Sequence, residues 1–285
     1  MGVSHGMEGL RIVGLNAFMP GFRLVHEFAE RNGHELVLVV TVPDAGRYGA
    51  SAPMVTELPE GMNVLITRKL RTVAASVIDA LRPDVIISAA FPRLIPAEIL
   101  EIPKFGAINC HPSPLPAGRG PTPQRLIYEG DQRVGASVHR TAAGFDTGSI
   151  LAQRIAPLPE DLNGSAIMAS WGELLRACLD EAVPKLVAGD PGIPQDPAQA
   201  SDAPFFTDAE RVLDLTEPSA VVRRKAAALN VTSNEATVRL GGTTYVIART
   251  DVVLGESRAA PGTVLAEHDD GWTVQTGDLP LRLTR

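Results

Sequence analysis

The sequence predicts an α/β protein whose mostly parallel sheet is followed by a small β-rich domain. Near-continuous apolar runs, such as residues 35–42 and 84–90, alternate with stretches of helical spacing, which is the pattern of βαβ units. From residue 205 onward, the apolar runs are shorter, alternate with polar residues and are separated by Gly/Asp turns. This second pattern is typical of a small barrel or sandwich.

The apolar runs of the first half are the expected strands of the sheet. They cover residues 10–15, 35–42, 63–67, 84–90 and 106–111, with helices expected over 22–31 and 73–81. A strand that is covered by helices on both faces has little need for alternation, which explains the continuous apolar runs. In such sheets, ligands bind beyond the carboxyl ends of the strands.

The second half begins with a long amphipathic pattern over residues 164–187, which predicts a helix. Residues 189–204 are rich in Pro, Gly and Asp and predict an extended linker, or a strap over the surface. A short helix is expected over 219–229. The predicted organisation is a domain over 10–188, a linker over 189–204 and a β-rich domain over 205–285.

Composition limits the class of protein. Apolar residues make up 45% of the 285 residues and the formal net charge is −7, which is ordinary for a globular protein and argues against nucleic-acid binding. Cys110 and Cys178 form no CxxC motif, so neither a disulfide framework nor a metal site is expected. No apolar run reaches the ~18 residues of a membrane span. Residues 1–9 have no signal pattern and are expected to be a disordered lead-in, which favours a cytoplasmic protein.

The first candidate site is the end of the strand over 106–111. Asn109 and His111 are two residues apart, so both side chains point to one face while Cys110 points to the other. Pro112 has no N–H to donate and therefore ends the ladder. An amide and an imidazole are thus presented side by side at the carboxyl edge of the sheet. The chain lacks G-x-G-x-x-G, P-loop, G-x-S-x-G and H-E-x-x-H motifs, so it offers no competing site of those kinds.

A second candidate is the turn over residues 144–148, which interrupts two β-like runs and displays the carboxylate of Asp146. If the fold brings Asp146 over His111, the site holds a base or proton shuttle and a carboxylate that biases it. Asn109 would add a neutral donor for an oxyanion. Acyl transfer to an amine needs these three roles.

The stretch over residues 105–153 resembles the formyltransferases that use 10-formyltetrahydrofolate, whose core carries N-x-H-x-S-x-L-P and a later D-x-G. The matching residues are Asn109, His111, Ser113, Leu115, Pro116, Gly120, Pro123, Gly130, Asp131, Gly135, Asp146 and Gly148. The resemblance covers residues 10–188 well and 205–285 weakly. It implies a Rossmann-like formyltransferase domain followed by an OB-like barrel, in the order of the methionyl-tRNA branch.

The resemblance also implies roles for individual residues. Asn109, His111 and Asp146 would be catalytic, with the amide and the protonated imidazole stabilising an oxyanion, and with Asp146 orienting His111 and helping to move the proton. Whether His111 or a water with Asp146 is the immediate base stays open. The pterin of 10-formyltetrahydrofolate, the formyl-donor cosubstrate, would be held by Phe91, Arg93, Leu94, Ile95, Phe145 and Asp146. Ser113, Arg119 and His139 are the candidates for acceptor binding.

Charge favours a small acceptor over tRNA. Residues 205–285 contain nine Lys/Arg and eleven Asp/Glu, a net charge of −2, whereas a tRNA-docking domain should attract phosphates. The basic insertion of the tRNA branch corresponds to residues 43–53, where Arg47 is the single basic residue. We therefore expect a primary or hydroxylated amine of a small-molecule or carrier-bound acceptor, such as an amino sugar, a siderophore amino acid or a secondary-metabolite precursor. The alternatives are a methionyl-tRNA formyltransferase and a catalytically silent folate-binding module. The sequence leaves the oligomeric state open.

Overall fold

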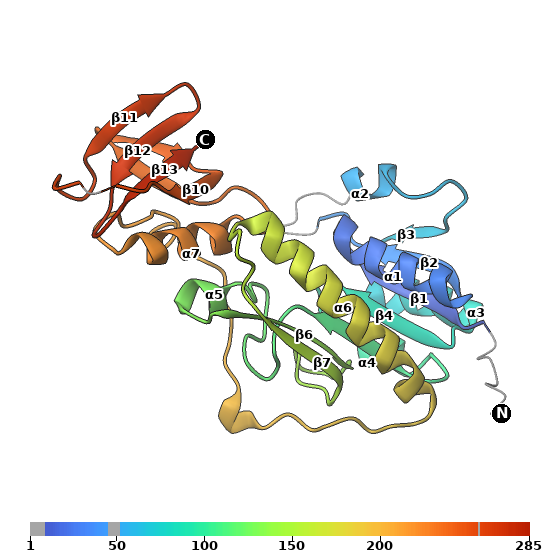
Figure 1. Ribbon diagram of the computed structural model, residues 1–285. Coiled ribbons are helices and arrows are strands. Elements are labelled where there is room, and N and C mark those ends of the chain that lie inside the picture. The colour runs from blue at the N-terminus through green and yellow to red at the C-terminus, as the bar shows by residue number, and fades with distance from the viewer. Residues whose placement is uncertain (1–8, 45–51, 256) are drawn as a thin grey trace. The chain divides into compact units, whose positions relative to one another are not determined.

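A computed structural model describes residues 9–44, 52–255 and 257–285 (Figure 1). The expected lead-in therefore lies outside the described residues, except for Gly9. The chain divides into two compact units. The first contains the residues up to Arg119, Gly135–Arg154 and Gly172–Ala200, and the second contains Gly120–Val134, Ile155–Trp171 and Ser201–Arg285. None of the helices in the described part of the chain has both the length and the hydropathy needed to cross a membrane.

The main sheet has seven strands in the order β3-β2-β1-β4-β5-β6-β7. They are β1 (Arg11–Asn16), β2 (Glu35–Thr41), β3 (Val64–Ile66), β4 (Val85–Ala89), β5 (Ala107–His111), β6 (Arg133–Arg140) and β7 (Ile150–Pro157). The first five strands pair in parallel, and β6 runs antiparallel to β5. The predicted α/β class with a mostly parallel sheet is confirmed.

Helices cover both faces of this sheet, as the apolar strands require. The helices of this part of the chain are α1 (Met19–Asn32), α2 (Ala52–Thr56), a π-helical turn (Leu70–Ala74), α3 (Ala75–Leu81), α4 (Ala97–Leu100) and α6 (Gly164–Val187). Buried residues of α1 and α6 form one cluster with alternate residues of the strands. Residues of α3 and α4 form another with Val13, Leu15, Ile86 and Ala107, which belong to the other face of the strands.

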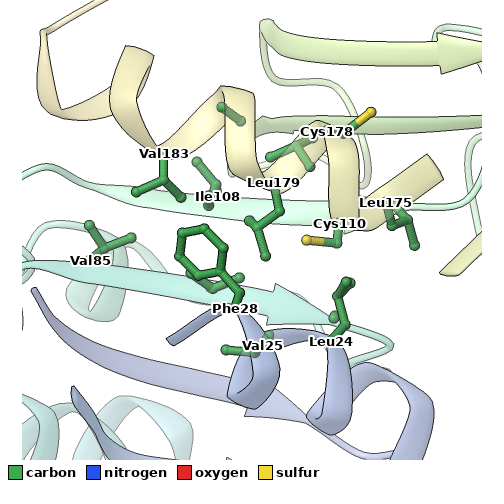
Figure 2. Packing of buried hydrophobic residues seen from close by; sticks show 14 of the residues in the cluster. Leu24, Val25, Phe28, Val85, Ile108, Cys110, Leu175, Cys178, Leu179 and Val183 are labelled. Atoms are coloured by element: carbon green, nitrogen blue, oxygen red, sulfur yellow. The ribbon is translucent and has the colours of Figure 1, made fainter. Parts of the chain in front are cut away.

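The alternation along β5 follows directly from these two clusters. Cys110 and Ile108 belong to the cluster of α1 and α6, and Figure 2 shows Cys110 among Leu24, Leu175 and Leu179. Ala107 belongs to the opposite cluster. Asn109 and His111 have the parity of Ala107, so they face the α3/α4 side and Cys110 does not. Burial raises the pKa of the Cys110 thiol above its usual range, so this cysteine is an apolar core residue.

The second unit is built on its own apolar core, formed by α7 (Ser219–Leu229), the strands that follow it and Phe206, Leu213 and Leu215. The strands are β8 (Thr237–Leu240), β9 (Thr243–Val246), β10 (Arg249–Val252), β11 (Val264–His268), β12 (Gly271–Gln275) and β13 (Pro280–Thr284). Four of them form a sheet in the order β10-β13-β12-β11, and β8 pairs with β9. The helix α5 (Arg125–Glu129) also belongs to this unit. The predicted β-rich character of residues 205–285 is confirmed.

Residues 189–204, expected to be a linker or strap, contain a single 3-10 turn (Pro197–Gln199). Ile193 forms an antiparallel bridge with Ile150 at the start of β7, with N–H···O distances of 2.8 Å in both directions. The segment thus belongs to the first unit up to Ala200. The last part of the second unit begins at Ser201.

Candidate active site

The candidate site lies where β5 ends beside the antiparallel strand β6. In the register of these two strands Asn109 pairs with His139 and His111 with Ser137. Residues that pair across a sheet point to the same face, so one amide and two imidazoles share this face. His111 and His139 are buried, with 6% and 1% of their surface exposed.

The turn after β6 carries Asp146 and bends sharply back over β6. Asp146 has a φ of +54°, in the left-handed region that Asp tolerates better than most residues. Two residues later, a Cβ added to Gly148 would lie 1.7 Å from the carbonyl oxygen of Arg140. Only glycine permits this approach, which explains the glycine of the D-x-G sequence.

The structure brings the three predicted catalytic side chains together. Nδ2 of Asn109 donates to Oδ1 of Asp146 at 3.1 Å, and Nδ1 of His111 lies 3.6 Å from Oδ2 of the same carboxylate. Both side chains of the His111–Asp146 pair are at most 10% exposed. The amide, the imidazole and the carboxylate therefore form one connected cluster, from segments that are far apart in the sequence.

Hydrogen-bond partners define the tautomer of each imidazole. Nε2 of His111 lies 2.8 Å from the carbonyl oxygen of Gly118, and Nδ1 of His139 lies 2.8 Å from that of Arg140. A carbonyl oxygen only accepts, so each of these nitrogens carries a hydrogen. In neutral rings, Nδ1 of His111 and Nε2 of His139 are then free to accept.

Asn109 connects to His139 as well as to Asp146. Its Nδ2 lies 3.2 Å from Nε2 of His139, which is the accepting nitrogen of that ring. Both N–H groups of Asn109 are thus occupied, one by the carboxylate and one by the imidazole. Its Oδ1 takes part in no hydrogen bond among the residues that the structure describes.

The environment keeps His111 neutral at physiological pH. Burial lowers its pKa below 6.5, the neighbouring His139 lowers it further, and Asp146 and the Gly118 carbonyl oppose them. Desolvation is the largest of these effects, so the uncharged ring prevails. The result is a buried imidazole whose lone pair at Nδ1 faces a carboxylate oxygen of Asp146. A proton that arrives at Nδ1 would be stabilised there by Asp146.

The residues predicted to hold the pterin fall into two groups. Phe91, Arg93, Leu94 and Ile95 lie in the loop between β4 and α4, and Phe145 lies in the turn of Asp146. The side chains of Leu94 and Phe145 are 47% and 55% exposed, whereas Ile95 is buried in the core beneath α3 and α4. In the described structure, the backbone of residues 91 and 93–95 makes no hydrogen bond. Exposed apolar side chains and free backbone donors and acceptors fit a planar heterocycle with a polar edge.

The predicted acceptor-binding residues have partners within the protein. Oγ of Ser113 donates to the carbonyl oxygen of Ala117, and His139 is held as described above. Arg119 donates from Nε and Nη2 to Oε1 of Gln195, at 3.1 and 2.7 Å. Contact of these three residues with an acceptor stays a prediction.

Gln195 is a component of this region that sequence reasoning missed. Its Nε2 donates to the backbone carbonyls of Asp146 and Gly148, both at 2.7 Å. The residue lies in a Pro/Gly/Asp-rich stretch whose composition predicts only an extended chain, and no local pattern marks it. Over residues 9–44, 52–255 and 257–285, no group of three or more His, Cys, Asp or Glu side chains is arranged to hold a metal ion.

Comparison with known proteins identifies relatives of both parts of the chain. Residues 17–182 match the family described as "Formyl transferase", and residues 206–285 match "Formyl transferase, C-terminal domain". A methionyl-tRNA formyltransferase of Pseudomonas syringae is 34% identical over 293 residues, covering 98% of this chain and 90% of the relative.

Solved structures share the fold at lower identity. HypX from Aquifex aeolicus in complex with tetrahydrofolic acid superposes with a TM-score of 0.70 at 20% identity, covering 97% of this chain and 44% of HypX. An N-formyltransferase from Helicobacter canadensis in complex with folinic acid and dTDP-3-aminofucose has a TM-score of 0.69 at 13% identity. That match covers 96% of this chain and 99% of the Helicobacter protein.

Proposed function

The chain belongs to the family of 10-formyltetrahydrofolate-dependent formyltransferases, and we propose that its acceptor is a small-molecule or carrier-bound amine rather than methionyl-tRNA. The acceptor would be a primary or hydroxylated amine, as in an amino sugar, a siderophore amino acid or a secondary-metabolite precursor. The observation that supports this choice is that several basic side chains of the second, C-terminal unit contact acidic or carbonyl groups of the same unit.

The run Arg223–Arg224–Lys225 is the most basic segment of that unit. Nζ of Lys225 lies 2.6 and 2.7 Å from the two carboxylate oxygens of Glu217, and Nε of Arg223 donates to the carbonyl oxygen of Thr250. Nε of Arg224 is buried without a partner among the described residues. A cation that serves phosphates must be exposed and free of a competing carboxylate. The run from Arg223 to Lys225 is therefore poorly suited to binding tRNA phosphates.

Several other cations of the unit also have acidic partners. Arg211 pairs with Asp208 and Glu235, Arg249 with Asp161 and Asp251, and Arg282 with Asp270. In each of these pairs, the carboxylate would compete with a tRNA phosphate for the arginine. Together with the net charge of −2 over residues 205–285, this supports an acceptor other than a polyanion.

For the donor, we propose that the backbone of the 91–95 loop binds the polar edge of the pterin and that Leu94 and Phe145 contact its faces. The exposed apolar surface of these two side chains and the unpaired backbone of the loop support this assignment. Ile95 is buried, so it would contribute through its backbone alone. 10-Formyltetrahydrofolate supplies a formyl group on a nitrogen that can leave as an amine.

In the reaction, the acceptor nitrogen bonds to the formyl carbon, the bond to N10 of the folate breaks, and one proton passes from the acceptor nitrogen to N10. We propose that His111 and Asp146 hold this proton during the transfer. His111 accepts it at Nδ1, where Asp146 faces the ring, while Nε2 stays bound to the Gly118 carbonyl. This pathway needs the neutral ring, which burial favours.

Asn109 is proposed to stabilise the negative charge that develops on the formyl oxygen. Both of its N–H groups are occupied, so Nδ2 must release His139 or Asp146 to serve that oxygen. The free Oδ1 can in turn accept a hydrogen from the incoming amine. Exchange of one hydrogen bond for another costs little compared with leaving a buried donor unpaired.

We also propose that residues 10–188 form the catalytic domain, 189–204 the connecting segment and 205–285 the C-terminal domain. The limits of the two family matches, 17–182 and 206–285, support these boundaries.

Methionyl-tRNA is the second candidate acceptor, because the Pseudomonas relative with that name aligns with nearly the whole chain. A direct test incubates the purified protein with 10-formyltetrahydrofolate and, separately, a nucleotide-linked amino sugar, a hydroxylated amino acid and methionyl-tRNA. Absorbance follows the release of tetrahydrofolate, and mass spectrometry follows the gain of one CO by each acceptor.

Turnover with a small amine supports the proposal. Faster turnover with methionyl-tRNA than with any small amine overturns it. Folate binding without turnover on any of the acceptors would instead identify a silent folate-binding module.

A further inference from the structure

The segment between α6 and the 3-10 turn is attached to the loops of the active site. Besides the bridge from Ile193 to Ile150, Oγ of Ser149 donates to the carbonyl oxygen of Pro191, and Nη2 of Arg140 donates to that of Asp190. A Cβ on Gly192 would lie 2.9 Å from the Ile150 carbonyl oxygen, so the two segments approach closely. Residues 190–193 therefore run alongside the chain that leaves the Asp146 turn.

Gln195 follows at the end of this attached segment, and its amide reaches two different loops. Nε2 donates to the carbonyl oxygens of Asp146 and Gly148, at 2.7 Å each, which uses both of its hydrogens. Oε1 accepts from Nε and Nη2 of Arg119, at 3.1 and 2.7 Å. One amide side chain thus makes four hydrogen bonds, and the bonds to the arginine are charge-assisted.

These two loops are the ones that hold the His111 ring. Gly118, next to Arg119 in the chain, accepts from Nε2 of His111 through its carbonyl oxygen. Asp146 faces Nδ1 of the same ring. Gly118 has a φ of +75° and Asp146 a φ of +54°. Both residues therefore need a left-handed backbone conformation, which their loops must maintain.

We propose that Gln195 is a positioning residue for formyl transfer, which ties the Gly118–Arg119 loop to the Asp146 turn and so sets the ring of His111 against the carboxylate of Asp146. This inference rests on the roles proposed above for His111 and Asp146. Without Gln195, the two loops lose their shared partner, while Asp146 keeps its contacts with Asn109 and His139 on the adjacent strands. A displacement of about 1 Å at reacting groups can lower a rate by about 100-fold.

The test replaces Gln195 by Met, which keeps the length and volume of the side chain but removes its hydrogen bonds. The control is Gln199→Ala, on the same segment, where the exposed side chain bonds only to Asp196. We expect kcat of Gln195→Met to fall about 10-fold or more while KM for 10-formyltetrahydrofolate changes less than about 3-fold. The control should match the wild type in both.

A second readout does not depend on turnover. The pKa of His111 is measured by NMR of its ring carbons in the protein without substrate. The titratable groups that face the ring are Asp146 and His139. Asp146 and the Gly118 carbonyl both raise this pKa, so loosening their loops in Gln195→Met should lower it by about half a unit or more.

A pKa of His111 that is the same in Gln195→Met and wild type would overturn the inference, as would an unchanged kcat. A loss of kcat that follows only from a lower Tm, with His111 titrating as in the wild type, would also overturn it. Failure of the proposed acceptor class would leave the NMR result untouched, so the two proposals fail separately.

Discussion

Nδ2 of Asn109 donates to Oδ1 of Asp146 at 3.1 Å, joining residues that are 37 positions apart. This bond connects the middle of β5 to the loop that follows β6. It also occupies one of the two hydrogens with which Asn109 could stabilise an oxyanion. The amide and the carboxylate are therefore arranged against one another before any substrate is bound.

Replacing Asn109 by Ala removes the proposed oxyanion donor. We expect turnover of formyl transfer to fall by about 10²–10³-fold, the usual effect of losing one such donor. The fold should stay intact, with Tm lowered only by the loss of the hydrogen bonds to His139 and Asp146. Asn234→Ala, at an exposed position, is the matched control. Near-normal turnover of Asn109→Ala would remove the assignment.

Asp146→Asn keeps the shape of the side chain and removes its charge. Asn also tolerates a φ of +54°, so the turn should form and circular dichroism should be unchanged. Without the carboxylate, a proton on Nδ1 of His111 loses its stabilising partner, and turnover should fall about 100-fold or more. Equal turnover of the variant and the wild type would exclude Asp146 from the handling of the proton.

The low pKa of His111 has a consequence for stability. The unfolded chain, with an ordinary histidine pKa near 6.5, binds this proton more readily than the folded protein does. The free energy of unfolding should therefore decrease as pH falls below 6.5 towards the folded pKa. Burial of His34 acts in the same direction.

Urea unfolding of the wild type and of His111→Gln, at pH 7.5 and at pH 5.5, isolates the contribution of His111. The decrease on acidification should be smaller in the variant. An identical decrease in the two proteins would show that His111 has an unperturbed pKa. If the neutral ring is the active form, wild-type kcat should also stay level above pH 6.5 and decline only in more acidic solution.

Gly148→Ala places a methyl group against the Arg140 carbonyl oxygen, at a distance of 1.7 Å unless the backbone moves. We expect a loss of about 2–4 kcal/mol in the free energy of unfolding, or a displaced Asp146 turn with low turnover. Gly172→Ala is the matched control, because nothing lies within 4 Å of its added methyl group and the position is inside α6. That variant should be about 0.5–1 kcal/mol more stable than the wild type. A Gly148→Ala protein with native stability and turnover would contradict the close approach.

Patterns of apolar and polar residues within single strands and helices predicted much of the fold and part of the candidate site. The period of two along β5 placed Asn109 and His111 on one face and Cys110 on the other, because alternation depends only on the backbone of the strand. The helical spacing over 164–187 predicted α6 with the bounds that the structure has. Both patterns arise within a few residues of chain, where sequence and geometry are directly linked.

The tertiary structure alone decided how these pieces meet. Gln195 belongs to a stretch that by composition is only a linker, yet its amide bonds to Asp146, Gly148 and Arg119, residues 47 to 76 positions away. Likewise, nothing in the strand pattern showed that β6 lies antiparallel to β5 and brings His139 to Asn109. Such contacts depend on the path of the whole chain, because a hydrogen bond needs two groups within about 3 Å and composition carries no information on that distance.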